Sequence, residues 1–135
     1  MKAKTRMSRV LAGLMVMCMM LTFTCCAAPN EGVNPRTMYF YGGSVEVGQY
    51  NGQAAILVST DASQKVDHIY HDVAVYYNGV HQFTNRYENW GKLSLDTTIY
   101  LNDVSSGDYV QVYTTHYTDH DGCVESASAY DSYTY

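Results

Sequence analysis

Short stretches of alternating hydrophobic and polar residues, separated by turn residues, run from about residue 37 to the end of the chain. A period of two residues predicts β-strands, because successive side chains of a strand point to opposite faces of a sheet. Helix-forming residues are scarce after residue 30, whereas Tyr, Val, Thr and Ser are frequent. The pattern predicts about seven strands, at residues 38–49, 53–59, 66–77, 80–88, 92–101, 109–117 and 123–130.

Two Asn-Gly pairs, at residues 51–52 and 78–79, predict tight hairpins. The second hairpin joins residues 66–77 to residues 80–88, which we expect to pair antiparallel. Within residues 66–77, Ile69, Val73 and Val75 share one face and form the better core candidate. Polar residues 61–65 are expected to end a strand. The predicted fold is an all-β, antiparallel sandwich of about seven strands with an immunoglobulin-like arrangement.

The first residues have the pattern of a helical secretory signal peptide. Four cations precede an apolar run at residues 10–22, which is shorter than the roughly 20 residues that a membrane-spanning helix needs. Small residues favour a cut after Ala27, so we expect a signal peptide at 1–27, a flexible tether at 28–36 and the β-sandwich domain at 37–135. The expected location is extracellular, with no membrane span after cleavage. The alternative is a lipoprotein anchored through Cys25 or Cys26.

The charge of the mature chain changes which partners are expected. All four leader cations are lost on cleavage, and the remaining 4 cations and 13 acidic residues give 4 − 13 = −9. Such a charge repels phosphate backbones and anionic lipid, so no nucleic-acid or membrane-surface partner is expected. A cationic partner is an alternative to the simpler reading that the charge maintains solubility.

Cys123 is the only cysteine beyond the leader. It follows a glycine at a predicted strand start, which favours a buried, inert thiol. A reactive thiol, or pairing between two chains, is the alternative.

Several stretches resemble a loose group of small secreted β-sandwich proteins of unknown function from Gram-positive, Clostridia-like bacteria. The resemblance depends on residues 35–37, on VAVYYNGVHQF at residues 73–83, and most of all on VSSGDYVQVYTTHYTDHDGCVESAS at residues 104–128. It implies export and a β-sandwich. Its motifs are structural, so it implies no activity.

Candidate chemistry is sparse. His68 and His71 point to opposite faces of an extended strand, so they do not chelate one ion together. Asp119, His120 and Asp121 form the densest polar cluster and are weak candidates for a Ca²⁺ site, although a solvated turn is favoured. No nucleophile elbow, HExxH motif or phosphate-binding glycine loop occurs in the sequence. We therefore expect no enzyme and no cofactor.

The tyrosines are the most informative residues, since all 14 lie after residue 30. A domain of this size does not bury all of them, and an exposed tyrosine offers a large contact face with few rotatable bonds. The ligand-binding candidates are Trp90, Tyr109, Tyr113 and Tyr117. The simpler reading is that tyrosine satisfies β-propensity at half-buried positions. The expected function is a secreted, non-catalytic binding or interaction module at or beyond the cell envelope, with a glycan or protein ligand. The alternatives are a bacteriocin-like β-sandwich toxin and a weak extracellular hydrolase.

Overall fold

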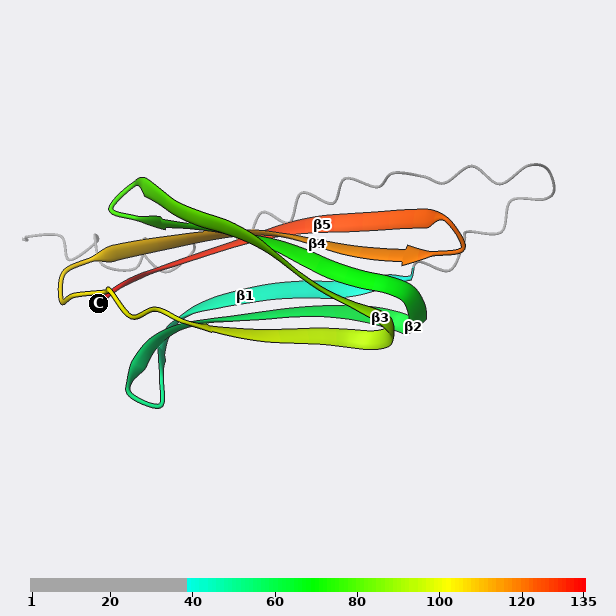
Figure 1. Cartoon of the computed structure of the whole chain (residues 1–135), viewed down its shortest axis with the longest axis horizontal. Coiled ribbons are helices and arrows are strands. Elements are labelled where there is room, and N and C mark those ends of the chain that lie inside the picture. Colours follow the sequence, from blue (N-terminus) through cyan, green and yellow to red (C-terminus); the bar gives the residue numbers. More distant parts are fainter. Residues whose placement is uncertain (1–38) are drawn as a thin grey trace, which may run out of the picture.

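A computed structural model describes residues 39–135, which form five β-strands and no helix (Figure 1). The strands are β1 (Phe40–Tyr50), β2 (Gln53–Tyr77), β3 (Val80–Tyr100), β4 (Tyr109–His120) and β5 (Cys123–Thr134). Every pairing between them is antiparallel, which confirms the all-β prediction. The predicted leader and tether lie outside the described residues. Within residues 39–135, no helix is long and apolar enough to cross a membrane.

The prediction of seven separate strands is wrong, because two predicted breaks are bends inside longer strands. Between the pairs Asp61↔Ser94 and Val66↔Lys92, β2 advances five residues while β3 advances two. The polar stretch at residues 61–65 thus forms a bulge that bends both strands without ending them. On β3, Gly91 lies at this bend with φ of 62°, a left-handed conformation that glycine adopts readily.

The bend turns the sheet back over itself, so that it forms two layers (Figure 1). The first layer consists of β1, residues 53–61 of β2 and residues 94–100 of β3. The second layer consists of residues 66–77 of β2, residues 80–92 of β3, and strands β4 and β5. Because β2 and β3 belong to both layers, the two layers form one continuous curled sheet.

The apolar core lies between the layers. Ile56 and Val58 project into it from the first layer, and Val73, Val75 and Val112 from the second. The predicted inner face of residues 66–77 is confirmed, since Ile69, Val73 and Val75 are fully buried. Both Asn-Gly hairpins are confirmed as well, because all four turn residues have positive φ values, as the preferred two-residue hairpin turn requires.

Side chains join the two ends of the curled sheet, where β1 and β5 face each other. The backbone N–H of Phe40 donates to the Glu125 carboxylate at 2.6 Å, and that of Val47 donates to the Asp131 carboxylate at 2.7 Å. The Tyr135 hydroxyl donates to the carbonyl of Gly48 at 2.6 Å. These bonds satisfy backbone groups of β1 that would otherwise form an open sheet edge.

Cys123 lies half-buried at the start of β5 and is disulfide-bonded. The prediction of an inert thiol is therefore wrong. Cys123 is the only cysteine among residues 39–135. The sequence pattern around Cys123 gave no indication of this bond.

Candidate functional site

The outward side of the second layer has a continuous group of aromatic side chains. On β2 the odd-numbered residues from 69 to 75 are buried, so the even-numbered residues point outward. Residues directly opposite on neighbouring strands point to the same side. Trp90 lies opposite His68, and Tyr117 opposite Tyr70. We call the resulting set the aromatic face, and its members are His68, Tyr70, Tyr76, Trp90, Tyr109, Tyr113, Tyr117 and Tyr130.

Four of these rings form a stacked row across three strands. The rings of Trp90 and His68 are nearly parallel, with centroids 4.7 Å apart and an interplanar angle of 5°. His68 also stacks on Tyr70 at 4.6 Å, and Tyr70 on Tyr117 at 4.5 Å. The row is held at the sheet by its own ring contacts, so its side chains keep a fixed arrangement without a ligand.

Arg86 completes the environment of Tyr70. Its guanidinium lies 4.6 Å from the Tyr70 ring centre and binds both carboxylate oxygens of Asp72, at 2.7 and 2.8 Å. Burial raises the pKa of Tyr70, so its phenol stays neutral at physiological pH. The one arginine among the described residues is thus already paired with a carboxylate.

A second group of rings continues the face toward the other end of β4. The Tyr113 ring lies 5.6 Å from Tyr76 and 4.7 Å from Tyr130. Hydroxyl contacts join Tyr109 to Tyr130 at 3.2 Å and to Ser132 at 3.1 Å. The structure therefore places all four predicted ligand-binding candidates on one surface. It also adds His68, Tyr70, Tyr76 and Tyr130, which the sequence analysis did not select.

The members of the aromatic face differ in how much ring surface they offer. Tyr70 has His68 and Tyr117 stacked against it, whereas Trp90 stands at the end of the row and is 60% exposed. One side of the Trp90 ring packs on His68, and no other described ring contacts it. Tyr113 is 48% exposed. Trp90 and Tyr113 are therefore the residues best placed to contact a ligand.

Two histidines lie fully buried between the layers, in a hydrogen-bonded chain. Thr60 Oγ1 lies 3.0 Å from His71 Nδ1 and 2.7 Å from His116 Nδ1. At the two ends, His71 Nε2 lies 2.9 Å from Thr97 Oγ1, and His116 Nε2 lies 2.8 Å from Thr114 Oγ1. The chain connects both layers through polar groups that are all satisfied.

The hydrogens in this chain have one consistent direction. Thr114 donates to the carbonyl of Ala129 at 3.3 Å, so it accepts from His116 Nε2–H. His116 Nδ1 then accepts from the Thr60 hydroxyl, which in turn accepts from His71 Nδ1–H. Burial lowers the pKa of both histidines to about 4, so both rings are neutral at pH 7. Neither ring has a carboxylate hydrogen-bond partner among residues 39–135. This hydrogen-bonded series of side chains therefore lacks the carboxylate of a catalytic triad.

The sequence contained part of the signal for these buried histidines. His71 shares its parity with the core residues Ile69 and Val73, and His116 shares its parity with Val110 and Val112. Parity alone would have placed both rings inside. The bridging role of Thr60 depends on the bend in β2, which the sequence analysis did not predict.

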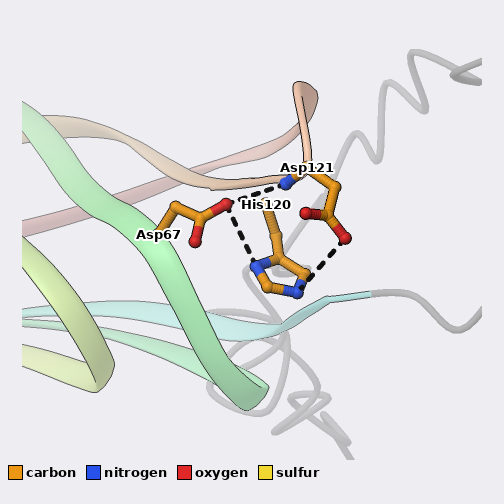
Figure 2. A group of neighbouring side chains, drawn as sticks. All are labelled: Asp67, His120 and Asp121. Carbon is orange, nitrogen blue, oxygen red and sulfur yellow. Dashed lines mark hydrogen bonds and ion pairs between the residues drawn. The ribbon is translucent and has the colours of Figure 1, made fainter.

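The polar cluster predicted at residues 119–121 consists of partly different residues in the structure (Figure 2). His120 and Asp121 approach Asp67 of β2, whereas Asp119 lies opposite His68, on the outward side of β4. One ligand atom from each of Asp67, His120 and Asp121 lies within 4.8 Å of the others. His120 Nδ1 is 3.3 Å from Asp67 Oδ2, and Nε2 is 3.7 Å from Asp121 Oδ2.

Two features of this cluster favour a turn held by its own polar contacts over a metal centre. Each nitrogen of His120 already faces a carboxylate, and the backbone N–H of Asp121 donates to Asp67 at 2.9 Å. Asp67 and Asp121 are exposed, which makes an ion bound there easy to lose to water. The hydrogen bond from Asp121 also holds the turn, in which Asp121 and Gly122 both have positive φ values.

A shallow hollow of about 250 Å³ lies on the outward side of the first layer. Its lining includes Ser59 and Asp96, and the Ser59 hydroxyl donates to the Asp96 carboxylate at 2.7 Å. The lining contains no histidine that could activate this serine. The hollow therefore offers polar contacts but no nucleophile of the serine-hydrolase type.

Comparisons with protein-family models, curated proteins and solved structures gave no match to this chain. The aromatic face combines exposed ring area with a set of side chains that pack on one another.

Proposed function

We propose that this chain is a secreted, non-catalytic binding module that acts at or beyond the cell envelope and binds its ligand through the aromatic face. The observation that carries this proposal is that Trp90, Tyr109, Tyr113 and Tyr117, from two different strands, lie on one outward surface. Exposed apolar patches with polar surroundings mark interaction sites. Tyrosine, tryptophan and arginine are also the residue types that most often dominate binding energy.

The charge of the domain supports a neutral or cationic ligand, either a glycan or a protein. Residues 39–135 contain 12 acidic side chains and 3 cations, which gives 3 − 12 = −9. Asp72, Glu88 and Asp119 lie on the same side of the second layer as the aromatic rings. A nucleic acid or an anionic lipid would meet repulsion at this surface.

Export is supported by the pattern of residues 1–27, which lie outside the described residues. The resemblance to small secreted β-sandwich proteins supports the same location and an immunoglobulin-like arrangement of the two layers. The alternative is a lipoprotein form, anchored through Cys25 or Cys26. Intact mass distinguishes the two forms, since it gives the cut site and any attached lipid.

Binding arrays of glycans and peptides test the proposed function, using Trp90→Ala and Tyr113→Ala beside Tyr41→Ala as the matched control. Tyr41 is 80% exposed but belongs to β1, outside the aromatic face. We expect each face variant to lose about 2 kcal/mol of binding free energy, or roughly 30-fold in affinity. The control should bind like the wild type. The proposal fails if nothing binds, or if all three variants lose affinity equally. Inhibition of neighbouring bacteria by the purified protein would instead favour the toxin alternative.

A further inference from the structure

Strand β3 has an open edge along its whole length in the described part of the chain. It pairs with β2 on one side, and no other strand of residues 39–135 pairs with it. The other two strand edges face each other and are joined by Glu125, Asp131 and Tyr135, as described above. Within residues 39–135, two strand edges are thus closed by side chains, and the third is unpaired over the 21 residues of β3.

The hydrogen-bond ladder shows which groups of β3 point away from the sheet. Asn78 N–H donates to the Tyr109 carbonyl at 2.8 Å, so even-numbered residues at this end of β2 direct their backbone groups to β4. Odd-numbered residues of β2 then bond to β3, because the two sides alternate along an antiparallel strand. Their partners include residues 83, 85 and 87. The N–H and C=O groups of Thr84, Arg86 and Glu88 consequently point outward from the open edge.

One detail of the structure agrees with this alternation. Trp90 is the next even-numbered residue, and its backbone N–H is capped by the side chain of Asn89 at 2.9 Å. At this one position of the open edge, the Asn89 side chain takes the place of a strand partner. Exposed apolar side chains also follow β3 from one end to the other, and they are Val80, Trp90, Leu93 and Tyr100. Long, exposed and partly apolar edges are the usual templates for pairing with another chain.

Charge indicates which kind of chain would pair there. A second copy of this domain would bring another −9 to the edge, whereas a basic segment would be attracted. One face of the Trp90 ring is open, which suits a lysine or arginine side chain. Glu88 points to the same outward side of β3, with its carboxylate 3.1 Å from His68 Nε2, and adds negative charge there. Arg86 does not oppose this, because Asp72 already pairs with it. The other two cations of the described residues, Lys92 and Lys65, lie past Trp90 at the bend around Gly91.

We propose that β3 accepts an extended, basic segment of a partner protein as an additional strand, with cationic side chains placed over Trp90 and beside Glu88. This inference rests on the proposed function and names the partner class. An added strand would lie about 4.8 Å beyond β3, so its alternate side chains extend the aromatic face. Backbone bonds to the outward groups supply affinity, and the cations supply selectivity.

A synthetic peptide of about nine alternating lysine and threonine residues, a length typical of strands, is the probe. Binding is measured by fluorescence anisotropy of the labelled peptide. Two further peptides are matched controls: one has glutamate in place of lysine, and one keeps lysine but has N-methyl groups along both backbone edges. We expect only the first peptide to bind the wild-type protein. Equal binding of the glutamate peptide or of the methylated peptide would overturn the proposal, and so would no binding at all.

Two variants at Thr84 test the edge itself. Thr84→Pro removes an outward N–H, which an edge strand tolerates without losing its ladder to β2. Thr84→Val keeps that N–H and loses the same hydroxyl, which contacts His81 at 2.8 Å. We expect Thr84→Pro to weaken peptide binding at least tenfold, and Thr84→Val to leave it unchanged, with circular dichroism confirming that both variants fold.

The outcomes separate this inference from the proposed function. If Thr84→Pro binds the peptide as well as Thr84→Val does, while Trp90→Ala does not, the aromatic face binds without strand addition and only the edge proposal is lost. If the wild type self-associates in sedimentation and Thr84→Pro does not, the edge accepts a second copy, which also overturns the proposal. The methylated peptide gives an independent answer if Thr84→Pro does not fold.

Discussion

Replacing Thr60 by valine removes the hydroxyl that joins the two buried histidines while keeping the side chain's size. In the wild type, this hydroxyl donates to His116 Nδ1 at 2.7 Å and accepts from His71 Nδ1–H at 3.0 Å. Valine leaves one acceptor and one donor buried without a partner. Each such group costs about 1–3 kcal/mol, so we expect Thr60→Val to destabilise the fold by about 2–6 kcal/mol. Movement of the His71 proton to Nε2 would still leave its Nδ1 without a partner.

Urea unfolding followed by far-ultraviolet circular dichroism measures this effect. Thr98→Val is the matched control, because Thr98 is an exposed threonine of β3 in the first layer. An exposed substitution of this kind is expected to change stability by less than about 0.5 kcal/mol. If Thr60→Val also stayed within that range, the buried hydrogen-bond chain would not stabilise the fold.

Three further predictions concern the interior and the closed edge. Gly43→Ala should cost about 1–3 kcal/mol of stability in the same urea assay, because an added Cβ would clash with the His116 ring. Gly48→Ala is the control and should be nearly neutral, because a Cβ there would have nothing within 4 Å. The two buried histidines have folded-state pKa values of about 4, below the ordinary value of 6.5. Between these two pH values the unfolded chain binds more protons than the folded protein. The free energy of unfolding should therefore fall as the pH drops from about 6.5 to 4. By pH 5 the loss relative to pH 8 is about 2 kcal/mol per histidine, and a flat unfolding free energy over this range would contradict the neutral, buried state. Glu125→Ala combined with Asp131→Ala frees two backbone N–H groups of β1 and should increase self-association in sedimentation; sedimentation identical to that of the wild type would show that these carboxylates do not protect the edge.

The sequence predicted the local features of this fold because they depend on neighbouring residues. Alternation along residues 66–77 placed Ile69, Val73 and Val75 inside, and the Asn-Gly pairs gave both hairpin turns. The bulge at residues 61–65 was not predicted, because polar residues in a bulge and in a strand-ending turn have the same composition. Its consequence was large, since the bend determines which strands face each other.

The candidate site, too, was predicted only in its local features. Composition identified tyrosine and tryptophan as contact residues, and parity limited the side to which each could point. The stacked row depends on the register between strands, which places His68 beside Trp90 and Tyr70 beside Tyr117. Register is set by turns and by packing of the whole sheet, so these neighbours were not predictable from spacing within one strand.

Trp90 is the only tryptophan of the chain and lies on the aromatic face, so its fluorescence reports directly on the proposed binding surface. The decisive measurement is acrylamide quenching of this emission, with and without saturating amounts of a ligand that the arrays identify. Bound ligand should shield the indole and reduce quenching severalfold. Quenching that stays the same while binding is demonstrated by calorimetry would contradict the assignment of the aromatic face as the binding site.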